Sequence, residues 1–234
     1  MNEAQVTPAV ETAAVLKVYP QGGADVRALS DVTLRIDPRE FVVLAGPSGS
    51  GKTTLLNLIG ALDRPTAGSI RVGGQDLGSL TSAERARVRR DHIGFVFQAY
   101  NLLPVLSALE NAALVLELQG LSRKESEARA ASMLRSVGLG DLVGRRPNAL
   151  SGGQQQRVAV ARAIASARTL VLADEPTANL DSKSAESLLE LMMELNQERG
   201  LTFVFSSHDP RVIARARRVI RLEDGRVVGD ERVR

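Results

Sequence analysis

The chain has 234 residues, of which 44% are hydrophobic, and this is enough for one domain with a sizeable core. It contains no cysteine, which excludes a disulfide framework and thiol chemistry. The formal net charge is only +3 and aromatic residues make up 3% of the chain. The chain therefore lacks the aromatic surface on which single-stranded nucleic acids stack, and we expect no nucleic-acid partner.

The first twelve residues, MNEAQVTPAVET, are mostly polar and form a predicted flexible N-terminus. They lack the cationic stretch followed by an apolar one that marks a secretory signal. No stretch of the chain approaches the roughly 18 consecutive apolar residues that a membrane-spanning helix needs. We therefore expect a single domain over residues 1–234 that stays in the cytoplasm and reaches a membrane only through a partner.

Apolar patterning predicts strands that alternate with helices. Residues 41–46, 169–174 and 201–207 are continuous apolar runs, typical of strands buried on both faces. This alternation predicts an α/β fold with a mainly parallel sheet. The other predicted strands are 13–19 and 32–36, which form an N-terminal antiparallel β portion, then 69–74 with its turn, 93–97, and a hairpin at Asp224–Gly225; the predicted helices are 52–62, 81–91 with Thr81 as its cap, and 182–200 with Asp181 as its cap.

Helices interrupt this alternation over about residues 100–165. Two helices are predicted between Ser107 and Gly138, divided near residues 120–122. Another helical pattern begins after the glycines at 152–153. We therefore expect an α-helical subdomain on one side of the sheet.

The stretch GPSGSGKTT matches the spacing G-x-x-x-x-G-K-[ST], and it lies between a predicted buried strand and a predicted helix, as this motif requires. The glycines let backbone N–H groups surround phosphates, and the helix N-terminus adds partial positive charge. Lys52 can reach the β- and γ-phosphates, and Thr53 can ligate Mg²⁺. The candidate residues of this phosphate loop are Gly46, Pro47, Ser48, Gly49, Ser50, Gly51, Lys52, Thr53 and Thr54.

Two acids follow the predicted strand in LVLADEP, residues 170–176. A buried strand should not end in two carboxylates unless they have a role. Asp174 fits a Mg²⁺-associated role, often through water. Glu175 is the next residue, so its side chain should point in a different direction from that of Asp174. It can accept a proton from an attacking water. An acidic helix cap explains either residue alone but does not explain the pair beside a phosphate loop.

Gln98 and His208 each follow a predicted strand. The neutral amide of Gln98 can touch Mg²⁺ and the attacking water without competing as a base. His208 can hydrogen-bond a γ-phosphate or position water. Taken alone, Gln98 has a simple interpretation as a surface residue and His208 as a structural one, so both assignments depend on their neighbours.

The stretch LSGGQQQRVAVARA, residues 150–163, joins two glycines and three glutamines to a helical pattern. It contains no carboxylate, histidine or cysteine, so it cannot do acid–base or metal chemistry alone. Placed before the acidic strand, LSGGQ resembles the signature of the ABC-type ATPase family, and Gln98, Asn179–Asp181 and His208 match further motifs of that family in order and spacing. Tyr19 lies where the family has an aromatic residue that stacks on adenine. The resemblance covers about residues 12–230.

This resemblance implies an ATP- and Mg²⁺-dependent hydrolase whose two copies pack head to tail. Glu175, His208 and Gln98 would be catalytic, and Thr53, Gln98 and Asp174 would lie at the Mg²⁺. The signature of one copy would close over the ATP held by the other copy, with the positive end of its helix aimed at the γ-phosphate. The residues acting on the partner's ATP would be Ser151, Gly152, Gly153, Gln154 and Asp181.

A narrower resemblance concerns the stretch FVFQAYNLLPVLSALENAAL, which is similar to the branch serving lipoprotein release, macrolide efflux and related peptide or glycolipid export. It implies that dimerisation driven by ATP powers a separate membrane permease and that the chain is peripheral on the inner face of the cell membrane. A related complex that regulates cell-wall hydrolysis at division remains the alternative.

Other classes of ATPase fit less well. ABC-type repair and chromosome proteins separate the phosphate loop from the signature by a long coiled coil, whereas here Ser151 follows Lys52 by only 99 residues (151 − 52). Translation factors of this type carry two cassettes in one chain, and this chain has one. A phosphate-loop kinase would give the signature no role.

Overall fold

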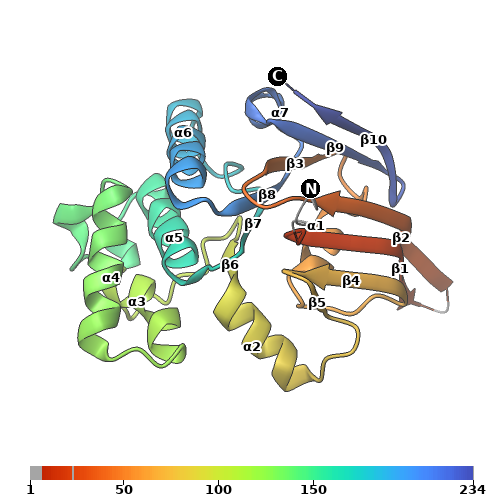
Figure 1. Ribbon diagram of the computed structural model, residues 1–234. Coiled ribbons are helices and arrows are strands. Elements are labelled where there is room, and N and C mark those ends of the chain that lie inside the picture. Colours follow the sequence, from red (N-terminus) through yellow and green to blue (C-terminus); the bar gives the residue numbers. More distant parts are fainter. Residues whose placement is uncertain (1–6, 23, 234) are drawn as a thin grey trace, which may run out of the picture.

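The structure is a computed structural model that describes residues 7–22 and 24–233. It contains two β-sheets, with helices packed around them (Figure 1). The strands are β1 (Val10–Gln21), β2 (Ala24–Ile36), β3 (Phe41–Ala45), β4 (Ala67–Val72), β5 (Gln75–Asp76), β6 (Ile93–Val96), β7 (Leu170–Asp174), β8 (Thr202–Ser207), β9 (Arg218–Glu223) and β10 (Arg226–Arg232). The α-helices are α1 (Lys52–Ile59), α2 (Ser82–His92), α3 (Ala108–Leu118), α4 (Arg123–Ser136), α5 (Gly152–Ser166), α6 (Ser182–Arg199) and α7 (Pro210–Arg215), and short 3₁₀ turns cover Gly140–Leu142 and Pro147–Ala149.

The central sheet has six strands in the order β10-β9-β3-β8-β7-β6. All neighbours from β9 to β6 pair in parallel, and only the β9–β10 hairpin is antiparallel. Every residue of β3 and β8 is buried, because helices or the second sheet cover both faces. Alternate residues of β3 therefore enter different cores: Phe41, Val43 and Ala45 face one cluster, and Val42 and Leu44 face the other. The predicted α/β fold with a mainly parallel sheet is confirmed.

The second sheet is antiparallel, with the order β2-β1-β4-β5. Its strands are longer than the sequence pattern predicted, since β1 begins at Val10, which pairs with Ile36 on one side and Val72 on the other. The prediction of a flexible segment over residues 1–12 is therefore wrong for residues 10–12, whose hydrogen bonds fix them in a sheet. Residues 1–6 of that segment lie outside the described residues.

Helices α3, α4 and α5 form a group beside the central sheet, on the left of Figure 1. Each begins with a serine whose side chain accepts a hydrogen bond from the third backbone N–H of the helix, while the glutamate or glutamine at that position bonds back: Ser107 with Glu110, Ser122 with Glu125, and Ser151 with Gln154. Such capping boxes fix where a helix starts. The start of α5, and with it the signature segment (residues 150–154), is therefore set locally.

Close backbone packing joins α5 to the central sheet. A Cβ placed on Gly94 in β6 would lie 2.3 Å from the carbonyl oxygen of Ala163 in α5, so only glycine allows this approach. The position of the signature segment is thereby tied to β6, the strand that leads to Gln98. Among the described residues, no helix is both long and apolar enough to cross a membrane.

Candidate functional site

A cavity of about 490 Å³ opens beside the loops that follow the parallel strands. Loops at the carboxyl ends of parallel strands meet at one edge of the sheet, which is where such folds bind ligands. The cavity brings together most of the phosphate loop, the candidate base and the two polar residues that follow strands. Its lining residues include Pro47, Ser48, Gly49, Gly51, Lys52, Thr53, Thr54, Gln98, Glu175 and His208.

The phosphate loop connects the buried strand β3 to helix α1. Gly51 caps α1 in a left-handed conformation with φ 98°, and a Cβ there would lie 2.6 Å from the Ala28 carbonyl oxygen, so this position requires glycine. The Nζ atom of Lys52 donates to the carbonyls of Gly46 at 2.8 Å and Pro47 at 2.9 Å. The lysine charge therefore lies over the loop, beside the free N–H groups at the start of α1.

Asp174 lies at the end of β7 and is held by two hydroxyl groups. Thr53 Oγ1 donates to Asp174 Oδ1 at 3.0 Å, and Ser206 Oγ donates to the same carboxylate oxygen. Thr53 and Asp174, each predicted to lie at a Mg²⁺, are therefore in direct contact. Ser206 is fully buried on β8 and was not predicted; a serine inside the apolar run of 201–207 was the signal for it.

Glu175 points into the cavity because the backbone turns sharply after Asp174. Its φ is 45°, an uncommon value for a residue with a side chain, and its N–H donates to the Ser206 carbonyl at 3.1 Å. One carboxylate oxygen lies 2.8 Å from His208 Nδ1. The Glu175 side chain is 16% exposed and that of His208 is 69% exposed, so the carboxylate lies deeper and the imidazole at the cavity mouth.

Gln98 lines the cavity directly after β6. Its backbone carbonyl accepts a hydrogen bond of 3.0 Å from the Asn179 side chain. The two motifs that contain Gln98 and Asn179 are therefore joined within one chain.

Tyr19 does not line the cavity, although it was predicted as a nucleotide contact. Its hydroxyl donates to Asp63 Oδ2 at 2.8 Å, and Lys17 Nζ lies 4.6 Å from the centre of its ring while also bonding Asp63 at 2.8 Å. Burial and the hydrogen bond to Asp63 raise the pKa of Tyr19, and a bond with Thr54 opposes this. Burial of Asp63 is outweighed by the bonds from Lys17 and Tyr19, which hold its pKa below the usual value. Asp63, which sequence reasoning missed, thus fixes this aromatic ring near the phosphate loop.

The signature segment lies apart from this cavity. None of Ser151, Gly152, Gly153 and Gln154 is among the residues that line it. Ser151 is exposed at the N-terminus of α5. A Cβ on Gly153 would lie 3.5 Å from Ser184 Oγ, and that hydroxyl donates to Asp181 Oδ2 at 2.6 Å. The segment and Asp181 are therefore close neighbours at a second place on the surface.

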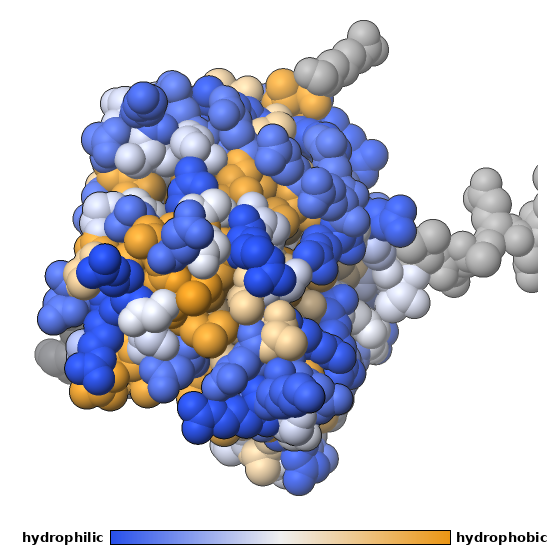
Figure 2. All heavy atoms as spheres, turned by 90° about the vertical axis from the view of Figure 1, so that its left-hand side faces the viewer, coloured by the Kyte–Doolittle hydropathy of each residue, from blue (hydrophilic) through white to orange (hydrophobic). Residues whose placement is uncertain are grey.

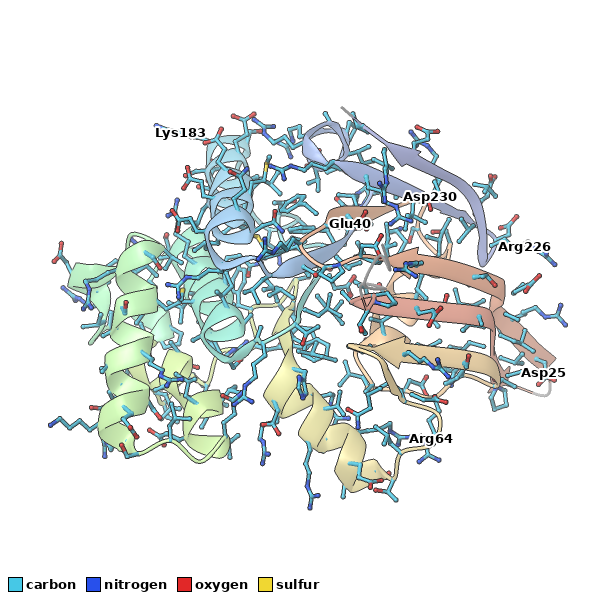
Figure 3. The ribbon with its side chains drawn as sticks, viewed as in Figure 1. Asp25, Glu40, Arg64, Lys183, Arg226 and Asp230 are labelled. Atoms are coloured by element: carbon cyan, nitrogen blue, oxygen red, sulfur yellow. The ribbon has the colours of Figure 1, made fainter. Side chains whose placement is uncertain are left out.

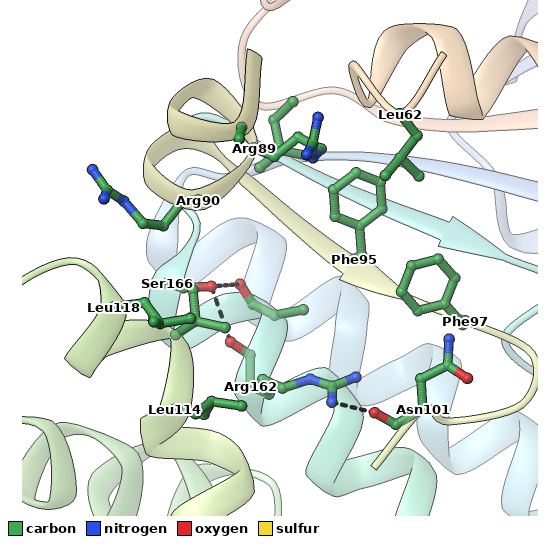
Figure 4. Close-up of a pocket in the computed structure, with 14 residues that line it drawn as sticks. Leu62, Arg89, Arg90, Phe95, Phe97, Asn101, Leu114, Leu118, Arg162 and Ser166 are labelled. Carbon is green, nitrogen blue, oxygen red and sulfur yellow. Dashed lines mark hydrogen bonds between the residues drawn. The ribbon is translucent and has the colours of Figure 1, made fainter. Parts of the chain in front are cut away.

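A groove of about 360 Å³ lies between α2, α3, α5 and β6 (Figure 4). Its walls are largely apolar and include the ring of Phe97 and the side chains of Leu62, Leu114 and Leu118. The guanidinium of Arg162 enters it from α5 and bonds the backbone of Asn101 (Figure 4). Phe95, Phe97, Asn101 and Leu114 of its lining belong to the stretch 95–114, on which the narrower resemblance to export and release ATPases was based.

The family model described as "ABC transporter" matches residues 29–178, which include the phosphate loop, the signature and both acids. The chain belongs to the ABC transporter family. The lipoprotein-releasing system ATP-binding protein LolD of Anaeromyxobacter dehalogenans is 48% identical over 231 residues, 98% of this chain and 97% of that protein. The macrolide export ATP-binding/permease protein MacB of Burkholderia thailandensis is 47% identical over 95% of this chain. The chain spans only about a third (34%) of the length of that MacB relative.

Solved structures give the same result. The dimeric structure of the bacterial ABC transporter cassette MJ0796 has a TM-score of 0.89 and 44% identity, covering 96% of this chain and 99% of that one. A dimeric post-hydrolysis state of the same cassette, bound to ADP and Pi, is equally similar, with a TM-score of 0.89. The resemblance inferred from six motifs, and the fold it implied, are thereby confirmed. The roles of individual site residues stay predictions.

The contact between Tyr19 and Asp63 can be tested by titration, because Tyr19 and Tyr100 are the two tyrosines of the chain. In a Tyr100→Phe background, the phenol of Tyr19 should ionise above its usual 10.0, since burial and the Asp63 carboxylate both disfavour the phenolate. Adding Asp63→Asn should lower the midpoint towards 10.0, because it removes the nearby negative charge while burial remains. Phenolate absorbance against pH measures this, and equal midpoints with and without Asp63→Asn would contradict the contact.

Proposed function

We propose that this chain binds and hydrolyses ATP with Mg²⁺ and that its ATP-driven dimer powers a membrane permease. The observation that carries the proposal is the split arrangement of the site. One cavity gathers the phosphate loop, Glu175, His208 and Gln98, whereas the signature segment lies outside it. A complete site therefore needs a second copy of the chain.

The residues beside the phosphate loop fit Mg²⁺. They offer a hydroxyl from Thr53, a carboxylate from Asp174 and an amide oxygen from Gln98, and Mg²⁺ prefers such oxygen ligands. Within residues 7–22 and 24–233 there is no group of three or more His, Cys, Asp or Glu side chains that could hold a metal. One carboxylate and one hydroxyl suit an ion that is bound together with substrate phosphates. When bound, Mg²⁺ would neutralise charge on those phosphates.

Each residue of the cavity then has a defined task. Lys52 leaves the carbonyls of Gly46 and Pro47 to pair with the terminal phosphates of ATP, and the N–H groups at the start of α1 bind phosphate oxygens. Glu175 accepts a proton from the attacking water. His208, hydrogen-bonded to Glu175, holds that carboxylate in place, and Gln98 orients the water.

The signature segment supplies the missing part of the site in the other copy. Its Ser151 hydroxyl is exposed, and no acid lies within residues 150–154, so it can approach a γ-phosphate without repulsion. The free N–H groups at the N-terminus of α5 and the positive end of its helix dipole would both face that phosphate. The dimeric state of the related cassettes supports this arrangement.

The groove lined by Leu62, Leu114 and Leu118 is proposed to receive the permease. Leu118 is 60% exposed and Leu62 is 47% exposed, although each borders a concave apolar surface. Viewed from the side of α3 and α4, the molecule exposes hydrophobic residues over the middle of the face with hydrophilic residues around them (Figure 2). Apolar surfaces with polar rims are typical of protein interfaces. A short amphipathic segment of the permease fits such a groove, and it would hold the chain at the membrane.

The relatives support a proposal for the cargo class. Similarity to a lipoprotein-releasing ATP-binding protein and to macrolide export proteins favours export or the release of lipoproteins, peptides or glycolipids. Regulation of cell-wall hydrolysis at division is the second candidate function.

Replacing the proposed base tests the catalytic assignment. Glu175→Gln should slow hydrolysis on the order of 100-fold and leave ATP bound, so that the dimer accumulates. Size-exclusion chromatography with and without Mg-ATP measures the dimer, and phosphate release measures the rate. Glu198→Gln, at an exposed position on α6, is the control and should behave as wild type. Hydrolysis by Glu175→Gln at the wild-type rate would exclude Glu175 as the base.

Charging the groove tests the docking surface. Leu118→Asp should release the chain from membranes of its own host, because it buries a carboxylate in an apolar contact. Val228→Asp is the matched control, since Val228 is 59% exposed on β10 and lies outside the groove. The fraction of tagged chain that sediments with the membranes is the measurement. Equal sedimentation of Leu118→Asp and wild type would contradict docking in this groove.

A further inference from the structure

Arg162 is a partly buried cation on α5. Among residues 7–22 and 24–233, no carboxylate lies within ion-pairing distance of it. Burial lowers the pKa of its guanidinium, which shows that this charge is partly removed from water. Such removal is costly unless other polar groups compensate it. The compensation comes from two backbone carbonyls: Arg162 Nη1 donates to the carbonyl of Asn101 at 2.6 Å and Nη2 donates to that of Tyr100 at 2.9 Å.

The two residues that accept these bonds have strained backbones. Tyr100 has φ 58° and Asn101 has φ 49°, and this left-handed region is unfavourable for residues other than glycine. Asparagine tolerates this conformation better than tyrosine does. Local preference therefore does not explain the turn, and charge-assisted hydrogen bonds from Arg162 are strong enough to hold it.

This turn lies between the cavity and the signature segment. Gln98, two residues before Tyr100, lines the cavity. On the other side, a Cβ on Gly152 would lie 2.9 Å from the Tyr100 hydroxyl oxygen, so the tyrosine side chain packs directly on the signature. Helix α5 thus contacts the loop at its first residue, through Gly152, and again ten residues later, through Arg162.

We propose that Arg162 is a positioning residue for ATP hydrolysis: through the carbonyls of Tyr100 and Asn101 it fixes Gln98 relative to the catalytic cavity and the signature helix. The inference rests on the proposed ATPase function. It predicts that loss of the guanidinium fork acts through Gln98 and leaves ATP binding to the phosphate loop intact.

A double-mutant cycle with Gln98 tests this proposal. Arg162→Gln should lower kcat about tenfold, because small misplacements of positioning groups have effects of this size or larger, with KM for ATP changed less than about twofold. In a Gln98→Ala background the same substitution should change kcat less than about twofold, since the group it positions is gone. Arg162→Lys keeps the charge but not the fork and should fall between wild type and Arg162→Gln.

Arg157 provides the matched control on the same helix. Its guanidinium donates to the Val137 carbonyl at 2.8 Å and to Ser187 Oγ at 2.8 Å, so it joins α5 to neighbouring helices without touching the turn at Tyr100. Arg157→Gln should lower the melting temperature and change kcat by the same factor in both backgrounds. An equal factor for Arg162→Gln in both backgrounds, or a wild-type kcat, would overturn the positioning role.

Amide hydrogen exchange gives a readout that does not depend on activity. Arg162→Gln should speed exchange in residues 98–103 about tenfold by releasing the turn, whereas Arg157→Gln should leave that segment unchanged. If Arg162→Gln does not fold, Arg162→Lys takes its place in both measurements. If the wild type hydrolyses no ATP, the proposed function fails and the exchange data alone decide: unchanged exchange in residues 98–103 would overturn the proposal.

Discussion

The parallel pairing of β3, β8 and β7 is the constraint on which the site depends. Ala45 pairs with Ser207 and Asp174 pairs with Ser206, so all three strands end at the same level. Four features lie at these strand ends: the phosphate loop, Asp174, Glu175 and His208. The parallel register therefore places them next to one another. Ser206 then bonds Asp174 and holds the backbone of Glu175, which sends two neighbouring carboxylates in different directions.

The phosphate loop and the signature segment, the two proposed halves of an ATP site, lie at different places on the chain. The phosphate loop provides positive charge and backbone N–H groups. The signature segment provides glycines, a hydroxyl group and a helix N-terminus, and its residues do not line the cavity. The loop from Gln98 to Asn101 joins the two places, because it contacts Asn179, Gly152 and Arg162. The same loop borders the apolar groove through Asn101.

Local sequence patterns predicted the elements whose ends are marked by capping residues, glycines or turn residues. The caps at Thr81 and Asp181, the left-handed Gly200 that ends α6 and the hairpin at Asp224–Gly225 lie where the sequence placed them. The short helix α7 was missed, because its six residues, Pro210–Arg215, give too little periodicity. Contacts set by tertiary packing were also missed: Ser206 on Asp174, Asp63 on Tyr19 and Arg162 on the turn at Tyr100 each join residues far apart in the chain, and no spacing rule reveals them.

The central claim is that the signature segment acts on the ATP of a second copy, and disulfide trapping tests it most directly. The chain has no cysteine, so an introduced cysteine is its only thiol. One copy carries Ser48→Cys and a copy of different size carries Ser151→Cys, both at exposed positions. Both copies also carry Glu175→Gln. On mixing, ATP should produce a disulfide between copies of different size, and no such product should form without ATP or when Ser132→Cys on α4 replaces Ser151→Cys. Absence of the mixed product with ATP present would show that the signature segment does not reach the phosphate loop of a second copy.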